Sequence, residues 1–100
     1  MSCFNSSLDD VHKNNFGTRI TLTAAYSLSD PFIVPEDGYL EVYQGSLRVY
    51  GATGEMTSSN FAFVLYGNTD TEVTSSTFVR KGMRVVFAKG SGGCKYVPLT

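Results

Sequence analysis

The pattern that most constrains the fold is an alternation of short β-type segments and turn residues, which runs from residue 18 to residue 99. In Pro31–Gly45, β-forming residues precede the turn sequence Pro-Glu-Asp-Gly, and a segment with alternating apolar residues follows. Gly38 can take the positive φ that such a turn often requires. Residues 78–87 repeat the arrangement with an apolar run, a charged turn and a second run. Two strand–turn–strand units are therefore predicted.

The whole chain shows about eight such segments at roughly ten-residue spacing, with turn residues between them and no sustained helical period. This spacing predicts an all-β fold, an antiparallel β-sandwich of jelly-roll type. Residues 1–17 are polar and turn-rich, and we interpret them as an N-terminal arm or linker before a β-sandwich domain at 18–100. The expected strands are Thr18–Ser27, Phe32–Val34, Tyr39–Tyr43, Leu47–Tyr50, Asn60–Tyr66, Val73–Val79, Met83–Ala88 and Cys94–Leu99.

Charge and composition exclude several classes of protein. A net charge of −1 argues against a binder of the nucleic-acid backbone, which needs a basic face. No apolar run approaches the length of roughly 20 residues that spans a membrane. The sequence shows no secretory signal, so we expect either synthesis in the cytoplasm or a domain excised from a longer protein. The two cysteines, Cys3 and Cys94, are interpreted as reduced thiols, with a bridge between them as the alternative.

Two of the expected strands, Asn60–Tyr66 and Met83–Ala88, are apolar on both faces. Two such strands in so small a sandwich suggest that one face of a sheet is buried against another chain. We therefore predict a homo-oligomer. Its expected interface consists of Phe61, Phe63, Leu65, Met83, Val85 and Phe87.

The sequence also resembles a known family. Residues 31–40 are similar to the "apolar, Pro, acidic, Asp-Gly, aromatic" hairpin of small jelly-roll domains in phage tail fibres, an architecture broadly similar to trimeric C1q/TNF-like heads. Residues 78–83 resemble the "V-x-K-G-D" turn of those domains, although Met83 stands where Asp is common. The ending Tyr96–Leu99 resembles their "F-I-P-L" terminus. The likeness covers residues 18–99.

This resemblance implies a homotrimeric fibre domain on a virion that contacts a glycan or protein on the bacterial host surface. Other virion proteins would be reached through the N-terminus, without membrane insertion or nucleic acid. Two other classes remain open. One is a monomeric carbohydrate-binding module with its aromatics on one flat face, and the other is a purely structural capsid or tail decoration domain.

The expected receptor-binding residues are aromatic and polar side chains suited to stacking on a sugar or anchoring a protein. We expect a sugar site to draw on the loops 51–60 and 67–72. A calcium site at Asn68, Asp70 and Glu72 is considered, but the loop lacks the full signature, so no metal and no cofactor are predicted. The predicted residues are Tyr39, Tyr43, Tyr50, Tyr66, Asn68 and Asp70.

Catalysis has little basis in the sequence. His12 is the one histidine, and it lies in the N-terminal arm, away from any recognisable nucleophile pattern. Residues 89–95 are Gly-rich but lack the Gly-Lys-Ser/Thr ending of a phosphate loop. We therefore expect a protein that is not an enzyme.

Overall fold

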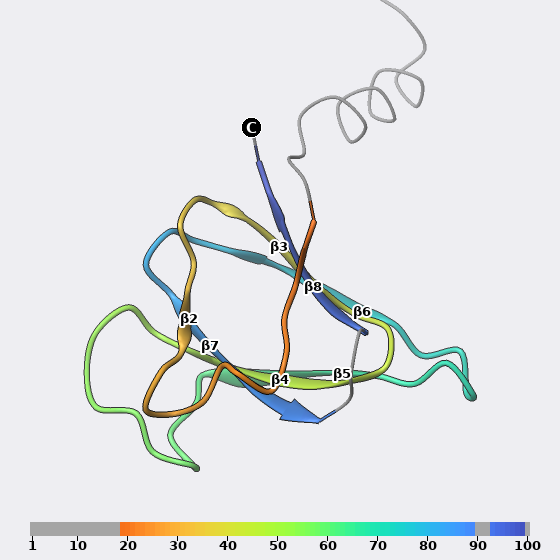
Figure 1. The fold of residues 1–100 in the computed structure, drawn as a ribbon, viewed down its shortest axis with the longest axis horizontal. Helices are drawn as coiled ribbons and strands as arrows, with labels where there is room; N and C mark the ends of the chain where they lie inside the picture. Colours follow the sequence, from red (N-terminus) through yellow and green to blue (C-terminus); the bar gives the residue numbers. More distant parts are fainter. Residues whose placement is uncertain (1–18, 90–92, 100) are drawn as a thin grey trace, which may run out of the picture.

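The computed structural model describes residues 19–89 and 93–99, and these residues form eight strands and no helix (Figure 1). No helix long and apolar enough to cross a membrane occurs among them. The strands are β1 (Ile20–Thr21), β2 (Phe32–Ile33), β3 (Gly38–Val42), β4 (Gly45–Tyr50), β5 (Phe63–Gly67), β6 (Ser75–Val79), β7 (Arg84–Lys89) and β8 (Cys94–Pro98).

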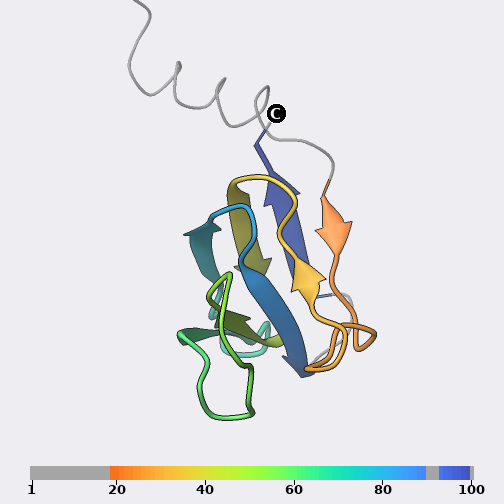
Figure 2. The ribbon, with the colours of Figure 1, turned by 90° about the vertical axis from the view of Figure 1, so that its left-hand side faces the viewer.

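The strands form two four-stranded antiparallel sheets, with the orders β1-β8-β3-β6 and β2-β7-β4-β5. We call them the first and second sheets. The chain passes from one sheet to the other at every connection except that between β4 and β5. This strand order is that of a jelly roll, and Figure 2 shows the two layers from the side. The predicted all-β sandwich is confirmed.

The core lies between the sheets, and β3 shows the alternation of buried and outward residues most clearly. In β3, Leu40 and Val42 are fully buried while Tyr39 and Glu41 are half-buried on the outer face, as the sequence predicted. Tyr96 of β8 is also fully buried. The core cluster comprises Leu22, Phe32, Val34, Leu40, Val42, Leu47, Val49, Leu65, Val79, Val85, Cys94 and Tyr96.

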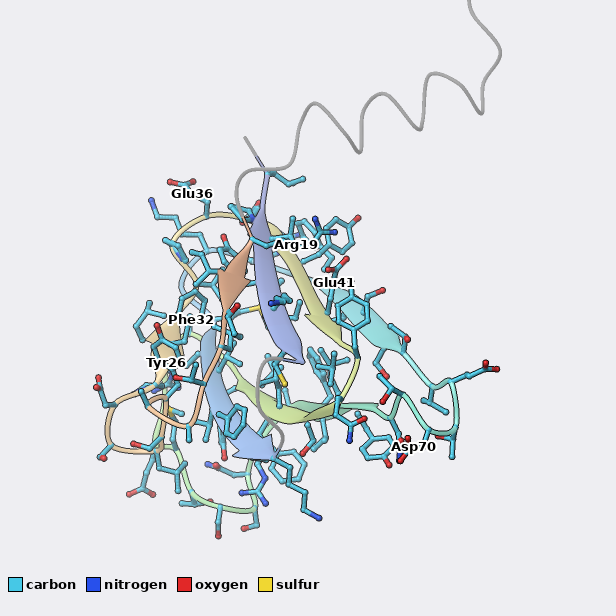
Figure 3. The ribbon with its side chains drawn as sticks, turned by 45° about the vertical axis from the view of Figure 1, so that its right-hand side comes forward. Arg19, Tyr26, Phe32, Glu36, Glu41 and Asp70 are labelled. Carbon is cyan, nitrogen blue, oxygen red and sulfur yellow. The ribbon has the colours of Figure 1, made fainter. Side chains whose placement is uncertain are left out.

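The first strand is much shorter than the predicted Thr18–Ser27. β1 ends at Thr21, and the chain then turns, with the amide of Tyr26 donating to the carbonyl of Thr23 at 3.1 Å. The alternation of residues 20–26 misled the prediction because Tyr26 reaches the core from this turn instead of from a strand. Its ring lies edge-on to that of Phe32, with centroids 5.2 Å apart (Figure 3).

The two predicted turn units lie side by side. The amide of Val34 donates to the carbonyl of Met83, and the amide of Gly82 donates to the carbonyl of Val34, both at 2.8 Å. Gly82 has a φ of 93°, which favours glycine. Gly38 could take a positive φ, but its φ is not positive. Glycine is needed there since a Cβ would lie 2.4 Å from the carbonyl oxygen of Val97.

The long loop after β4 folds back on itself. It connects β4 to β5, which are adjacent strands of the second sheet. The Tyr50 hydroxyl donates to the carbonyl of Thr57 at 2.7 Å. Asn60 accepts from the Thr57 amide through Oδ1 and donates through Nδ2 to the carbonyl of Glu55, both at 2.7 Å. The loop's polar groups therefore largely satisfy one another.

Candidate functional site

The loop between β5 and β6 brings together three of the six predicted binding residues. The side-chain amide of Asn68 donates to the hydroxyl of Tyr66 at 3.0 Å, and Asn68 Oδ1 accepts from the amide of Asp70 at 2.9 Å. The backbone groups of Asn68 and Val73 bond reciprocally at 2.8 and 2.9 Å and close the loop. Asn68 therefore fixes both the Tyr66 hydroxyl and the backbone that carries Asp70.

A neighbouring turn holds this loop in place. Gln44, between β3 and β4, accepts through Oε1 from the amide and the hydroxyl of Thr69, at 2.8 and 3.0 Å. The contact depends on Gly67, because a Cβ there would lie 2.2 Å from the carbonyl oxygen of Val42. Gln44 and Thr69 were not among the predicted site residues. A residue that braces a loop from a distant turn has no local sequence pattern.

The site presents an exposed aromatic ring at the end of β5 and an exposed carboxylate in the loop that follows it. Tyr66 is 50% exposed on the outer face of the second sheet, where its strand neighbour Val64 is also exposed. Asp70 is exposed, and no described side chain forms an ion pair with its carboxylate. An exposed aromatic ring with a fixed polar edge can stack on a sugar ring, and a free carboxylate can accept hydrogen bonds from sugar hydroxyls.

Tyr43 belongs to a different surface. Its hydroxyl donates to Oε1 of Glu41 at 2.8 Å, and the same oxygen accepts from Nε of Arg19 at 3.1 Å. The hydrogen bond to Glu41 is the main cause that raises the pKa of Tyr43. The separate hydrogen bond of Arg19 to Glu41 is the main cause that raises the pKa of Arg19. Figure 3 shows Arg19 and Glu41 on the first sheet, well apart from Asp70.

Two further predicted tyrosines are engaged in packing. Tyr50 is 2% exposed, because the loop 51–62 covers it, and its ring packs edge-on to Phe61 at 6.4 Å. The prediction that Tyr50 faces a receptor is therefore wrong. Tyr39 is half-buried on the outer face of the first sheet, where its ring lies edge-on to that of Phe78 at 5.6 Å.

The six predicted interface residues mostly point into the sandwich. Leu65 and Val85 belong to the core cluster, and Phe63, Met83 and Phe87 pack against it. These five side chains therefore contribute to the core of a single chain, and Leu65 and Val85 are buried there. Phe61 instead packs on Tyr50 and lies under the guanidinium of Arg48, 5.7 Å from the ring centroid. The alternate side chains of β5 are the exposed ones.

No metal or redox site emerges from the described residues. No group of three or more His, Cys, Asp or Glu side chains gathers among residues 19–89 and 93–99. Glu72, considered as a third calcium ligand, has a φ of 58° and faces solvent. Cys94 is a free thiol buried in the core, and burial raises its pKa. Cys3 and His12 lie outside the described residues.

Comparison with known proteins adds no relative. No protein-family model matches the chain, and neither the curated proteins nor the solved structures contain a match.

Proposed function

We propose that the domain binds a carbohydrate of a host cell surface through the β5–β6 loop, as a non-enzymatic part of a virion fibre. The observation that carries the proposal is the half-exposed Tyr66, whose hydroxyl accepts a hydrogen bond from Asn68, the residue that also holds the backbone amide of Asp70. Binding residues concentrate on loops that a rigid scaffold positions, and this loop is braced by Gln44. The fibre setting itself comes from the sequence resemblance.

Weak binding at each site would suffice in such a setting. Several linked copies raise the overall affinity without any new contact. The exposed aromatics favour this proposal over a carbohydrate-binding module with one flat platform, because Tyr66 lies on the second sheet and Phe78 on the first. A purely structural decoration domain is the remaining alternative, and a binding experiment separates it from the proposed function.

The test is a glycan array of bacterial surface sugars, followed by titration calorimetry of any hit. Tyr66→Ala removes the stacking ring and should weaken binding by about tenfold or more, since stacking is worth on the order of 1–2 kcal/mol. Tyr66→Phe keeps the ring and should bind more tightly than Tyr66→Ala. Asp70→Asn tests the carboxylate.

The matched control is Ile33→Ala. Ile33 is 52% exposed and lies in β2, at the opposite edge of the same sheet from β5. Its truncation removes a similar exposed apolar surface without touching the proposed site. No binding to any sugar, or equal affinity for Tyr66→Ala and Ile33→Ala, would overturn the proposal.

A further inference from the structure

The edge of the first sheet at β6 lacks the usual protection against pairing. β6 lies at the end of the order β1-β8-β3-β6, and no described strand lies on its other side (Figure 2). Its five residues, Ser75–Val79, include no charged residue and no proline, two kinds of residue that prevent edge strands from pairing with other chains. The edge strands at the opposite side of the sandwich, β1 and β2, are two residues long. β6 therefore offers a longer template for another strand than β1 or β2 does.

The hydrogen-bond pattern of β3 shows which groups of β6 face outward. In the ladder with β8, the amide of Tyr43 donates to the carbonyl of Gly93 at 2.7 Å and the amide of Leu99 to the carbonyl of Asp37 at 3.0 Å. Odd-numbered residues of β3 therefore bond to β8, and even-numbered residues such as Leu40 bond to β6. Leu40 lies opposite Thr77.

The same alternation continues into β6. The backbone groups of Thr77 are used toward β3, so those of its neighbours Ser76 and Phe78 point away from the sheet. Their side chains lie on the outer face, where both residues are exposed and Phe78 is 42% exposed. The edge thus offers two amides and two carbonyls beside an exposed aromatic ring, and the Phe78 carbonyl also accepts a long hydrogen bond, 3.5 Å, from the Thr77 hydroxyl. An extended backbone is the chemical partner that satisfies such a row of donors and acceptors.

The charges at the two ends of β6 favour a second copy in the antiparallel direction. Glu72 precedes the strand, and Arg80 and Lys81 follow it. All three are exposed, and within the described residues none of their side chains forms an ion pair. Antiparallel pairing of two identical strands places the basic end of one beside the acidic end of the other, whereas parallel pairing would place like charges together.

We propose that two copies of this chain pair through β6 about a two-fold axis at Thr77. Ser76 of each copy then lies opposite Phe78 of the other, and their outward amides and carbonyls bond reciprocally. The two first sheets become one continuous sheet across the dimer. This pairing does not depend on the proposed function. It is an alternative to the threefold association that the family resemblance implies, and the solution mass distinguishes them.

The first test is the mass of the full chain by analytical ultracentrifugation over a concentration series. We expect a concentration-dependent species of twice the 10.9 kDa chain mass. Ser76→Lys places a charge at the edge and should weaken dimerisation by at least about tenfold, with an unchanged melting temperature at concentrations where both proteins are monomeric. Ser58→Lys is the control, because Ser58 is exposed in the loop 51–62, and it should dimerise like the unmodified chain.

A charge swap tests the antiparallel direction. Glu72→Arg and Arg80→Glu should each weaken the dimer, and the double variant should restore it. A monomer at millimolar concentration, or a mass of three chains, would overturn the proposal. A dimer that neither Ser76→Lys nor the charge reversals weaken would overturn it as well.

Discussion

The carboxylate of Asp37 accepts a hydrogen bond from the backbone amide of Lys81, with Oδ1 and N 2.8 Å apart. The two residues are 44 positions apart in sequence and belong to the two turn units. The carbonyl of Asp37 also accepts from the amide of Leu99 at 3.0 Å. One residue therefore connects the turn before β3 both to the turn before β7 and to the end of β8.

Asp37→Ala should lower the free energy of unfolding by about 1 kcal/mol, because the Lys81 amide loses a charged acceptor. Asp37→Asn keeps an oxygen in place and should cost less. Urea denaturation monitored by circular dichroism measures both. The control is Asp30→Ala, since Asp30 is exposed and uses its backbone groups in its turn. Equal stabilities of the Asp37 and Asp30 variants would show that the carboxylate contributes nothing.

Gly38→Ala should destabilise the fold by about 2–4 kcal/mol, as overpacking against backbone does. The added Cβ would lie 2.4 Å from the carbonyl oxygen of Val97 and 2.9 Å from Cα of Pro98, and neither atom can rotate away. Gly51→Ala is the matched control, because its nearest neighbour would be the carbonyl oxygen of Thr53 at 4.0 Å. Thermal unfolding compares the two. A melting temperature of Gly38→Ala that matches Gly51→Ala would contradict the close approach.

Tyr96→Phe should lower the free energy of unfolding by about 1–3 kcal/mol. The Tyr96 hydroxyl donates to the carbonyl of Glu36 and accepts from its amide at 3.3 Å, so phenylalanine leaves both groups without this partner. The rest of the ring keeps its place in the core. Chemical denaturation measures the loss, and Tyr43→Phe, at an exposed position, provides the comparison. A smaller effect at Tyr96 than at Tyr43 would refute the assignment.

Alkaline pH should destabilise the protein through Cys94. Burial raises the pKa of this thiol above its ordinary value of 9.0, so the unfolded chain releases the proton at a lower pH than the folded chain. The contribution to stability is therefore complete below the ordinary pKa and is lost as pH rises toward the folded value. Cys94→Ala should flatten this decline, whatever its cost at neutral pH. The measurement is the free energy of unfolding as a function of pH, and parallel curves for the two proteins would count against it.

The alternation of residues 39–43 predicted β3 and the direction of its side chains, because a strand with one buried face carries its own pattern. Residues 61–66 carried less information. They are apolar on both faces, and nothing local says that Leu65 points inward while Val64 and Tyr66 point outward. Which side chains of β5 point inward depends on packing against the other sheet. Those contacts join residues far apart in sequence, so a short strand does not reveal them.

The candidate site was predictable in part, because local sequence carries information about residues that lie close together in the chain. Tyr66, Asn68 and Asp70 lie within five consecutive residues, so a sequence could place them in one loop. Tyr50 was equally plausible from sequence, yet the fold of residues 51–62 covers it. The contact of Gln44 with the β5–β6 loop could be inferred only from the fold, in which the ends of β3 and β5 lie side by side.

The strands β1 and β8 are antiparallel neighbours, with Ile20 opposite Tyr96, so Arg19 and Leu99 lie at the same end of the first sheet (Figure 1). The turn that carries Gln44 follows the other end of β3, where Val42 lies opposite Cys94. If the protein were attached to a solid surface near Arg19 or Leu99, the β5–β6 loop would therefore lie at the far end and face the solution. Immobilised protein should present the site to a ligand in one orientation, and the loop could be exchanged without disturbing the attachment.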